Sequence, residues 1–220
     1  MLAVAAQDSS RDAATFAKRV AEFDARAAAL ESAQQGEPAA TAALAWLRGL
    51  RAVLQAIPFE KPSAEIERWL KTHDELIVYS EPAGQWLISP NLLDGVHRQY
   101  AASKAGDEIA WLAVDNGMPG ECEVYIPCYA NGLNMLHGEY LRLHPRGAHR
   151  REALDQIDES LRNALLLLTE KDHSDFLTVP RDCGDLLAGA QPLRAALVGA
   201  GAAKTETIVL VDRLIALCPR

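Results

Sequence analysis

The sequence lacks any apolar run that approaches the roughly 20 residues a membrane-spanning helix requires. Its longest apolar stretches, such as 164–168 and 208–211, soon meet polar or charged residues. It also lacks an excess of positive charge, because 22 Lys and Arg residues stand against 30 Asp and Glu residues, giving a net charge of -8. Nucleic acid attracts proteins that carry basic surfaces. We therefore predict no membrane span and no nucleic-acid partner.

The common signatures of catalysis and cofactor binding are missing too. There is no H-E-x-x-H, no G-x-S-x-G and no C-x-x-C, which removes the usual zinc-protease, serine-hydrolase and thioredoxin patterns. Segment 198–205 resembles a phosphate-binding loop, but it lacks the glycine before Lys204 and follows a predicted helix. His137 and His144 are seven helical residues apart, about 10 Å by helical rise, which is too far for one metal ion. We predict no catalytic residues, no cofactor and no metal site.

Four cysteines form an even set whose spacing suits two disulfides. They are Cys122, Cys128, Cys183 and Cys218. A bridge between the first two requires a bend, which Gly120 and Pro127 supply, because six steps along a straight helix would separate them by about 9 Å. The last two are expected at the start of one late helix and the end of the next, which an antiparallel pair brings together. We predict the pairs 122–128 and 183–218; four unpaired buried thiols in a cytosolic protein are the alternative.

The beginning of the chain and the cysteines both bear on the compartment. Residues 1–7 are similar to the end of a signal peptide, with an Ala-x-Ala pattern but no charged start, although an alanine-rich chain gives such a pattern by coincidence as well. Disulfides form in oxidising compartments, and 16 Arg against 6 Lys is typical of a GC-rich bacterial genome. We expect a periplasmic or secreted bacterial protein, with 1–7 as a signal-peptide remnant and 8–220 as a single helical domain.

Apolar residues recur at helical spacing along most of the chain. The first predicted helix covers 11–34 and is expected to end at Gly36 and Pro38. In a later helix, Asp182 is expected to act as the cap and Pro192 to kink or restart the helix. Further helices are predicted around the apolar positions of 47–57, 66–70, 93–100, 109–112, 129–143, 154–168 and 205–217.

One segment departs from this helical pattern. Residues 76–88 contain two β-branched and aromatic runs joined by a turn with Pro82 and Gly84, which predicts a β-hairpin. The predicted fold class is therefore mainly α, built from antiparallel helical hairpins with one small β-hairpin near 76–88. No linker rich in Gly, Ser or Pro divides the chain.

Two eight-residue segments, 93–100 and 133–140, match at an offset of forty residues. Leu, His and Tyr are identical at corresponding places, and each copy is followed by a turn and another helix. This pattern predicts a degenerate repeat of two helical hairpins, which would stack on neighbours to bury their apolar faces. We expect the matched histidines, His97 and His137, to be structural. Of the tryptophans, Trp86 and Trp111 are expected in the core.

The second copy also carries a family resemblance over about 129–168. Its helix bears Tyr140 and ends at Pro145 and Gly147, and the next helix opens with the pair 153–154, Ala-Leu. This arrangement resembles the tetratricopeptide-like hairpins of bacterial envelope proteins, of the type found in outer-membrane assembly lipoproteins and the periplasmic partner of the Tol-Pal system. The resemblance implies a non-catalytic protein that binds another protein.

A run of arginines is the one concentrated positive feature of this acidic chain. It consists of Arg142, Arg146, Arg150 and Arg151. Guanidinium groups can make bidentate contacts to phosphate or carboxylate, so the run is a candidate patch for an anionic partner. The alternative is a solvated helix end whose cations favour the helix dipole. If this patch serves only to bind a partner, replacement of Arg142, Arg146 and Arg150 by Glu should leave helicity and the melting temperature unchanged.

Three functions are compatible with these features. The first is a non-catalytic periplasmic helical adaptor or binding protein of the bacterial envelope, with another protein as its partner. The second is a periplasmic immunity or inhibitor protein that blocks the basic cleft of a secreted toxin. The third is a cell-wall hydrolase that uses Glu121 and Glu123 beside Asp115 as an acid pair. No feature of the sequence predicts the oligomeric state.

Overall fold

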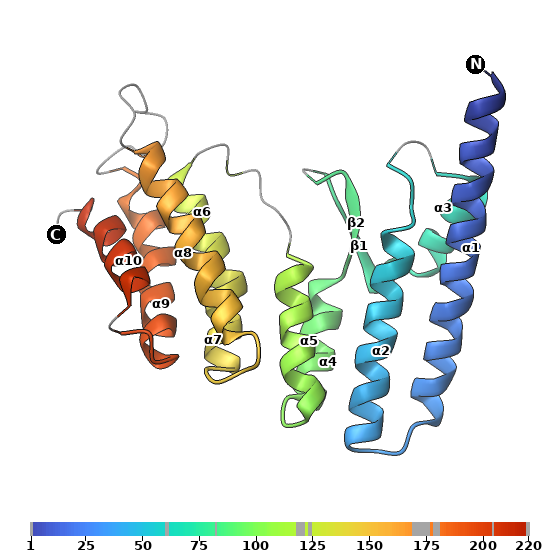
Figure 1. The fold of residues 1–220 in the computed structure, drawn as a ribbon, viewed down its shortest axis with the longest axis horizontal. Coiled ribbons are helices and arrows are strands. Elements are labelled where there is room, and N and C mark those ends of the chain that lie inside the picture. Colours follow the sequence, from blue (N-terminus) through green and yellow to red (C-terminus); the bar gives the residue numbers. More distant parts are fainter. Residues whose placement is uncertain are drawn as a thin grey trace. The chain divides into compact units, whose positions relative to one another are not determined.

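The computed structural model describes residues 2–59, 62–81, 83–117, 122, 125–168, 177, 181–203 and 205–218. These residues form a mainly helical protein with one two-stranded antiparallel sheet, which confirms the predicted fold class (Figure 1). The chain divides into two compact units, 1–118 and 119–220. The expectation of a single domain over 8–220 stays a prediction, because two compact units of one chain can still unfold together.

Helices make up most of the first unit. They are α1 (Leu2–Ser32), α2 (Glu37–Leu54), α3 (Ala64–Thr72), α4 (Pro90–Tyr100) and α5 (Lys104–Asp115), with the short 3₁₀ helix η1 (Asp74–Leu76) before the sheet. Between α1 and α2 the chain reverses at Gly36, whose φ of 90° favours glycine. Pro38 lies in the first turn of α2, where no N–H is required. The prediction that Pro38 ends the first helix is therefore wrong, because it begins the second.

The predicted hairpin consists of β1 (Ile77–Ser80) and β2 (Gln85–Ile88), joined by a turn with Gly84 at φ 60°. Ile77 pairs with Ile88 at its base and Ser80 with Gln85 at its tip. The buried side chain of Asn116, just after α5, completes the outer edge of β2. Its Oδ1 accepts from the Ile88 N–H at 3.0 Å and its Nδ2 donates to the Ile88 carbonyl at 2.9 Å. One side chain thus replaces a neighbouring strand at this point.

One apolar core joins the helices and the hairpin of the first unit. Its fully buried members include Ala40, Leu47, Leu50, Val53, Ile88 and Ile109. Phe23 of α1 is buried against Trp46 and Trp69, with ring centroids 6.0 and 6.1 Å away. Trp111 is also buried, as predicted, whereas Trp86 is only partly buried. Aromatic contacts therefore fix the second half of α1 to the rest of the unit.

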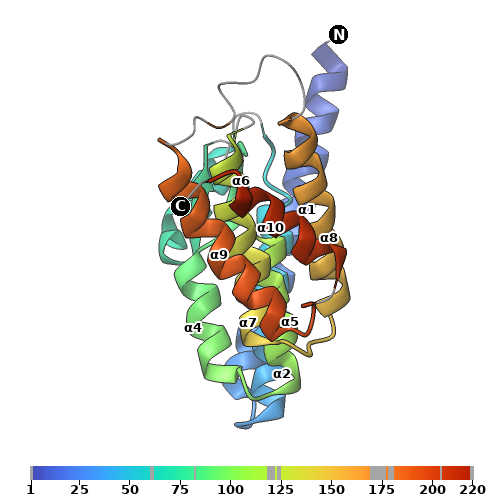
Figure 2. The ribbon, with the colours of Figure 1, turned by 90° about the vertical axis from the view of Figure 1, so that its left-hand side faces the viewer.

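The second unit contains α6 (Ile126–Leu133), α7 (Glu139–Leu143), α8 (Arg150–Leu167), α9 (Cys183–Gly199) and α10 (Glu206–Ala216). Between α6 and α7 lies a π-helical segment, η2 (Asn134–Gly138), so the helix predicted over 129–143 is present with a widened turn. Helix α9 lies across α6 and α7 (Figure 2). A Cβ added at Gly189 would lie 2.6 Å from the Asn131 nitrogen, so glycine permits the close approach of α9 to α6.

Helix α9 differs in two details from the sequence-based expectation. It continues through Pro192, which excludes a restart at that residue. Asp182 occupies the N-cap position, but its side chain makes no cap hydrogen bond. Instead, its Oδ1 accepts from Arg181 Nε at 3.0 Å.

The two segments of the predicted repeat do not occupy equivalent places in their helices. Segment 93–100 forms the C-terminal part of α4, whereas 133–140 spans the end of α6, the π-helical segment and the start of α7. Each is followed by a turn and a further helix, α5 and α8 respectively. The degenerate repeat of two helical hairpins stays a prediction.

Candidate binding surfaces

Both predicted disulfides are present in the second unit. Cys122 is bonded to Cys128 with Cα atoms 5.3 Å apart, and Cys183 to Cys218 with Cα atoms 5.5 Å apart. Cys183 is the first residue of α9 and Cys218 follows the end of α10. An antiparallel helical pair therefore brings the two sulfurs to one end, as the sequence predicts.

A tyrosine inside the smaller disulfide loop contacts the start of α9. Burial and then the negative charges of Asp182 and Asp185 raise the pKa of Tyr125 above its ordinary value, and the phenol also hydrogen-bonds the Asp182 side chain. Asp182 is buried and accepts a second hydrogen bond, from Arg181. The loop closed by the first disulfide is thus fastened to the helix that carries the second.

The arginines of the predicted patch differ in their contacts. Arg142 of α7 makes hydrogen bonds to two nearby residues. Its Nε donates to Glu139 at 2.8 Å, and its two terminal nitrogens donate to the Oδ1 and the backbone oxygen of Asn134 at 2.9 and 3.0 Å. Asn134 is the first residue of the π-helical segment, so Arg142 joins the start of this segment to the helix that follows it. Arg142 therefore stabilises the π-helical segment.

Arg150, at the start of α8, also makes a hydrogen bond to another part of the second unit. Its Nε donates to the Ala200 carbonyl at 2.7 Å, which ties α8 to the turn between α9 and α10. Arg151 is 92% exposed and forms a long ion pair of 3.8 Å with Asp155. Arg146 is exposed and forms no ion pair with the described residues. The expectation that reversal of Arg142, Arg146 and Arg150 leaves stability unchanged therefore conflicts with the hydrogen bonds of two of them.

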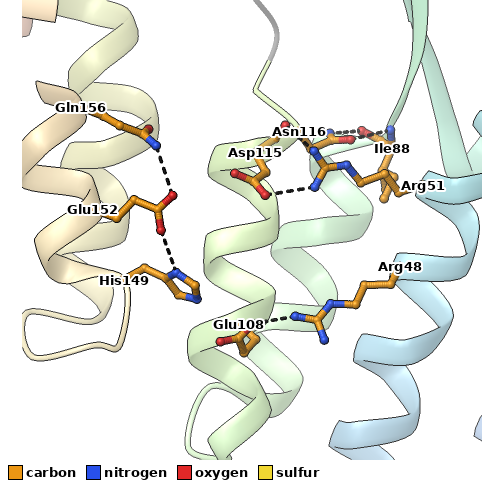
Figure 3. Close-up of polar contacts among 9 residues, drawn as sticks. All are labelled: Arg48, Arg51, Ile88, Glu108, Asp115, Asn116, His149, Glu152 and Gln156. Atoms are coloured by element: carbon orange, nitrogen blue, oxygen red, sulfur yellow. Dashed lines mark hydrogen bonds and ion pairs between the residues drawn. The ribbon is translucent and has the colours of Figure 1, made fainter. Parts of the chain in front are cut away.

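Two histidines of this region join a chain of polar contacts. His137 Nε2 lies 2.7 Å from Gln156 Oε1. Gln156 Nε2 donates to Glu152 at 3.4 Å, and the other Glu152 oxygen lies 3.3 Å from His149 Nδ1 (Figure 3). The His149 backbone N–H also donates to the Tyr140 hydroxyl at 3.0 Å. These contacts link the π-helical segment to the first turns of α8, which supports a structural role for His137.

The other repeat histidine, His97, is buried in α4. Its partner three residues later, Tyr100, packs partly buried against the core of the first unit. The position of both side chains on the inner side of α4 agrees with the predicted structural role. Among the described residues, no group of His, Cys, Asp and Glu side chains stands close enough together to hold a metal ion.

Helices η2 and α7, with the turn that follows α7, expose both apolar and cationic residues. We call this surface the η2–α7 face; it comprises Met135, Glu139, Arg142, Leu143 and Arg146. Met135 is 71% exposed and Leu143 is 45% exposed. Large apolar side chains beside arginine are typical of protein interfaces. Sequence periodicity did not single out Met135, because the widened turn of η2 changes which residues face solvent.

Ion pairs fasten α2 to α5 in the first unit. Arg48 lies 2.6 Å from Glu108, and Arg51 lies 3.1 Å from Asp115 and also donates to its backbone oxygen (Figure 3). The carboxylate of Asp115, proposed above as part of an acid pair, is thus engaged by an arginine. Its two suggested partners, at 121 and 123, lie outside the described residues.

Two pockets were not foreseen from the sequence. The hairpin pocket, about 420 Å³, is lined by Gln55, Pro58, Phe59, Tyr79, Gln85 and Trp86 with their neighbours. The α8–α10 pocket, about 510 Å³, is lined chiefly by Asp155, Asp158, Glu159, Arg162, Thr205 and Glu206. The first gathers aromatic rings from two separate segments, and the second gathers carboxylates. The side chains of each pocket come together only through tertiary folding.

Comparison with protein-family models, curated proteins and solved structures finds no match for this chain. Within the part of the chain that the structure describes, no helix is long and apolar enough to cross a membrane. The tetratricopeptide-like resemblance of 129–168 therefore stays a prediction, and the function must be proposed from the surfaces themselves.

Proposed function

We propose that the protein is a non-catalytic helical binding protein of the bacterial envelope, which holds another protein against its second unit. This proposal rests on the exposure of large apolar side chains on the η2–α7 face. Met135 projects into solvent, where exposure of a large apolar side chain is unfavourable by about 2 kcal/mol relative to burial. A partner that covers Met135 and Leu143 would recover this free energy.

The cations of the same face indicate which partner fits. Arg146 is free to meet an anionic group, and Arg142 keeps its guanidinium at the surface while it holds Asn134. Since Glu139 already pairs with Arg142, the face presents one net positive charge around two apolar side chains. An acidic protein surface with an apolar centre complements it.

The two disulfides support an oxidising compartment, because such bonds do not persist in most cytosolic proteins. We expect peptide mapping of the protein, alkylated in intact bacterial cells before lysis, to find both pairs oxidised. Recovery of four alkylated thiols would contradict the envelope assignment.

The binding proposal is tested by site-specific cross-linking in cells. A photo-reactive residue in place of Met135 is expected to capture one partner protein, whereas the same residue in place of Gln191, an exposed position of α9, is the matched control. The captured protein, purified separately, should bind the wild-type chain. Met135→Asp and Arg146→Glu, both at exposed positions, should each weaken that binding by about tenfold, or 1.4 kcal/mol. Unchanged affinity of both folded variants would overturn the proposal.

One observation favours the second candidate function, an immunity or inhibitor protein. The α8–α10 pocket carries four carboxylates and one guanidinium, so its described lining has a net negative charge. An acidic surface of this kind complements the basic cleft of a nucleic-acid-degrading toxin. Asp155→Lys with Glu159→Lys, both at exposed positions, would then abolish protection from the toxin and leave capture at Met135 unchanged.

A further inference from the structure

The hairpin pocket has a continuous aromatic wall. Tyr79 and Trp86 are directly opposite each other in the register of β1 and β2, and their ring centroids are 5.2 Å apart. Their neighbours on the same face, Ile77 and Ile88, are buried, whereas Tyr79 is 45% exposed. The face therefore changes from core at the base of the hairpin to open aromatic surface near its tip.

A third aromatic side chain lies beside this wall. Phe59 is 84% exposed, yet its ring lies so close to Gly84 that a Cβ at that position would clash with Phe59 Cε2. The positive φ of the turn favours glycine at this position. The segment after α2 and the tip of the hairpin are thus packed together, with an aromatic ring left facing water.

Apart from the aromatic rings, the described lining combines apolar residues such as Leu54, Ile57 and Pro62 with two glutamines. Gln55, just after α2, and Gln85, at the start of β2, line the pocket with exposed side chains. Neither side-chain amide forms a hydrogen bond with the described residues, whereas the Gln55 backbone N–H donates to the Arg51 carbonyl. Each offers donors and an acceptor, and no charged side chain is among the described lining residues.

We propose that the hairpin pocket binds a neutral saccharide. Sugar rings have a face of C–H groups, which carry slight positive charge and stack on the negative faces of aromatic rings. Their edges carry hydroxyl groups, which match the donors and acceptors of Gln55 and Gln85. A pocket with apolar walls and a few polar groups that fix orientation is the usual form of a small-ligand site.

The same wall disfavours a proline-rich peptide, the other neutral ligand that aromatic surfaces recognise. Such peptides insert proline rings into slots between aromatic side chains. Tyr79 and Trp86 contact each other at 5.2 Å, so no slot remains between them. The two ring planes are inclined by 56°, so each ring can stack on a ligand through its own face. This site belongs to the first unit and shares no residue with the η2–α7 face, so it does not depend on the function proposed above.

The test is saccharide binding by the full-length, oxidised protein. Neutral oligomers of glucose, of mannose and of N-acetylglucosamine are the probes, with saturation-transfer NMR to detect contact and calorimetry to measure affinity. We expect at least one probe to bind with a Kd below about 1 mM. Phe59→Ala and Gln85→Ala should each weaken it by about tenfold, and Gln191→Ala in α9 should not.

Both substituted side chains of the pocket are exposed, so the variants should retain the circular dichroism and melting temperature of the wild type. Absence of binding to all the probes would overturn the proposal. So would binding that survives both substitutions in the pocket. Binding of a proline-rich peptide at Phe59 with no saccharide bound would assign the pocket to the other ligand class and refute this one.

Discussion

Neighbouring arginines of this chain differ in role because their guanidinium groups reach different atoms. Arg150 reaches the Ala200 carbonyl at 2.7 Å, whereas Arg151, one residue later on α8, is turned by a helical step into solvent. A hydrogen bond from a charged donor to a partly buried carbonyl stabilises a fold, and an exposed ion pair of 3.8 Å adds little. Sequence proximity alone had grouped both in one patch.

We therefore expect Arg150→Ala to lower the free energy of unfolding by about 2 kcal/mol, because the Ala200 carbonyl loses a charged donor. Arg151→Ala is the matched control and should change it by less than about 0.5 kcal/mol. Urea unfolding followed by circular dichroism measures both. Equal effects of the two substitutions would show that the hydrogen bond contributes nothing to stability.

Tyr125 should make stability depend on alkaline pH. Burial and the nearby charge of Asp182 raise the pKa of this phenol in the folded chain. The unfolded chain therefore loses this proton first, and the free energy of unfolding must fall as the pH rises above about 10. Below that pH both states are protonated and the contribution is fully present.

The Tyr125→Phe variant isolates this effect. It should be less stable than the wild type at pH 8, because Asp182 loses a hydrogen bond, and its alkaline decline should be shallower. Unfolding free energies measured at intervals from pH 8 to about 11 test this. Parallel curves for the two proteins would show that Tyr125 has the same pKa in both states.

At the scale of helices, one glycine controls the contact between α6 and α9. A Cβ at Gly189 would lie 2.6 Å from the Asn131 nitrogen and 2.7 Å from the Ala130 carbonyl carbon, so the two backbones would have to separate. Gly189→Ala should therefore destabilise the second unit by about 1–3 kcal/mol, despite the better helix propensity of alanine.

Gly199, at the end of the same helix, is the matched control. No atom lies within 4 Å of a Cβ added there, so Gly199→Ala should leave stability unchanged or increase it by up to about 1 kcal/mol. Thermal unfolding of both variants provides the measurement. A Gly189→Ala protein as stable as Gly199→Ala would mean that α6 moves away without loss of packing.

Elements differ in how well the sequence predicts them. Periodicity identified the hairpin and most helices, because each apolar stripe is a local pattern that burial requires. It did not predict the π-helical segment, at whose first residue, Asn134, Arg142 of the next helix donates two hydrogen bonds. Pro38 was assigned to the end of the first helix, although it lies at the start of the second. Proline occurs both just after a helix end and in the first turn of a helix, so the residue type does not distinguish the two places.

The same distinction applies to the candidate sites. The pairing of Cys183 with Cys218 followed from the order of the helices. Two adjacent antiparallel helices bring the start of the first close to the end of the second. The hairpin pocket could not be predicted, since Phe59 and Tyr79 come from segments that are brought together only by tertiary folding. Trp86 and Trp111 were interpreted as core residues, which is correct for Trp111, whereas Trp86 is only partly buried.

For the whole molecule, the central question is whether the two compact units unfold together. Each unit has buried side chains of its own, represented by Leu47 and Ile109 in the first and by Tyr140, Leu161 and Leu193 in the second. Both disulfides lie in the second unit. By chain-entropy estimates, the bond that spans 35 residues contributes about 4 kcal/mol and the one that spans 6 about 2 kcal/mol.

Reduction therefore distinguishes the two cases. We expect dithiothreitol to destabilise the second unit alone, since the first has its own core and no disulfide. Hydrogen exchange followed by mass spectrometry should then show loss of protection in α9 and α10 and unchanged protection in α2 and α5. The variant Cys183→Ser with Cys218→Ser should reproduce most of this pattern without reductant. Simultaneous loss of protection in both units would instead establish the single cooperative domain that the absence of a linker predicts, because stability lost in one unit then lowers the stability of the whole chain.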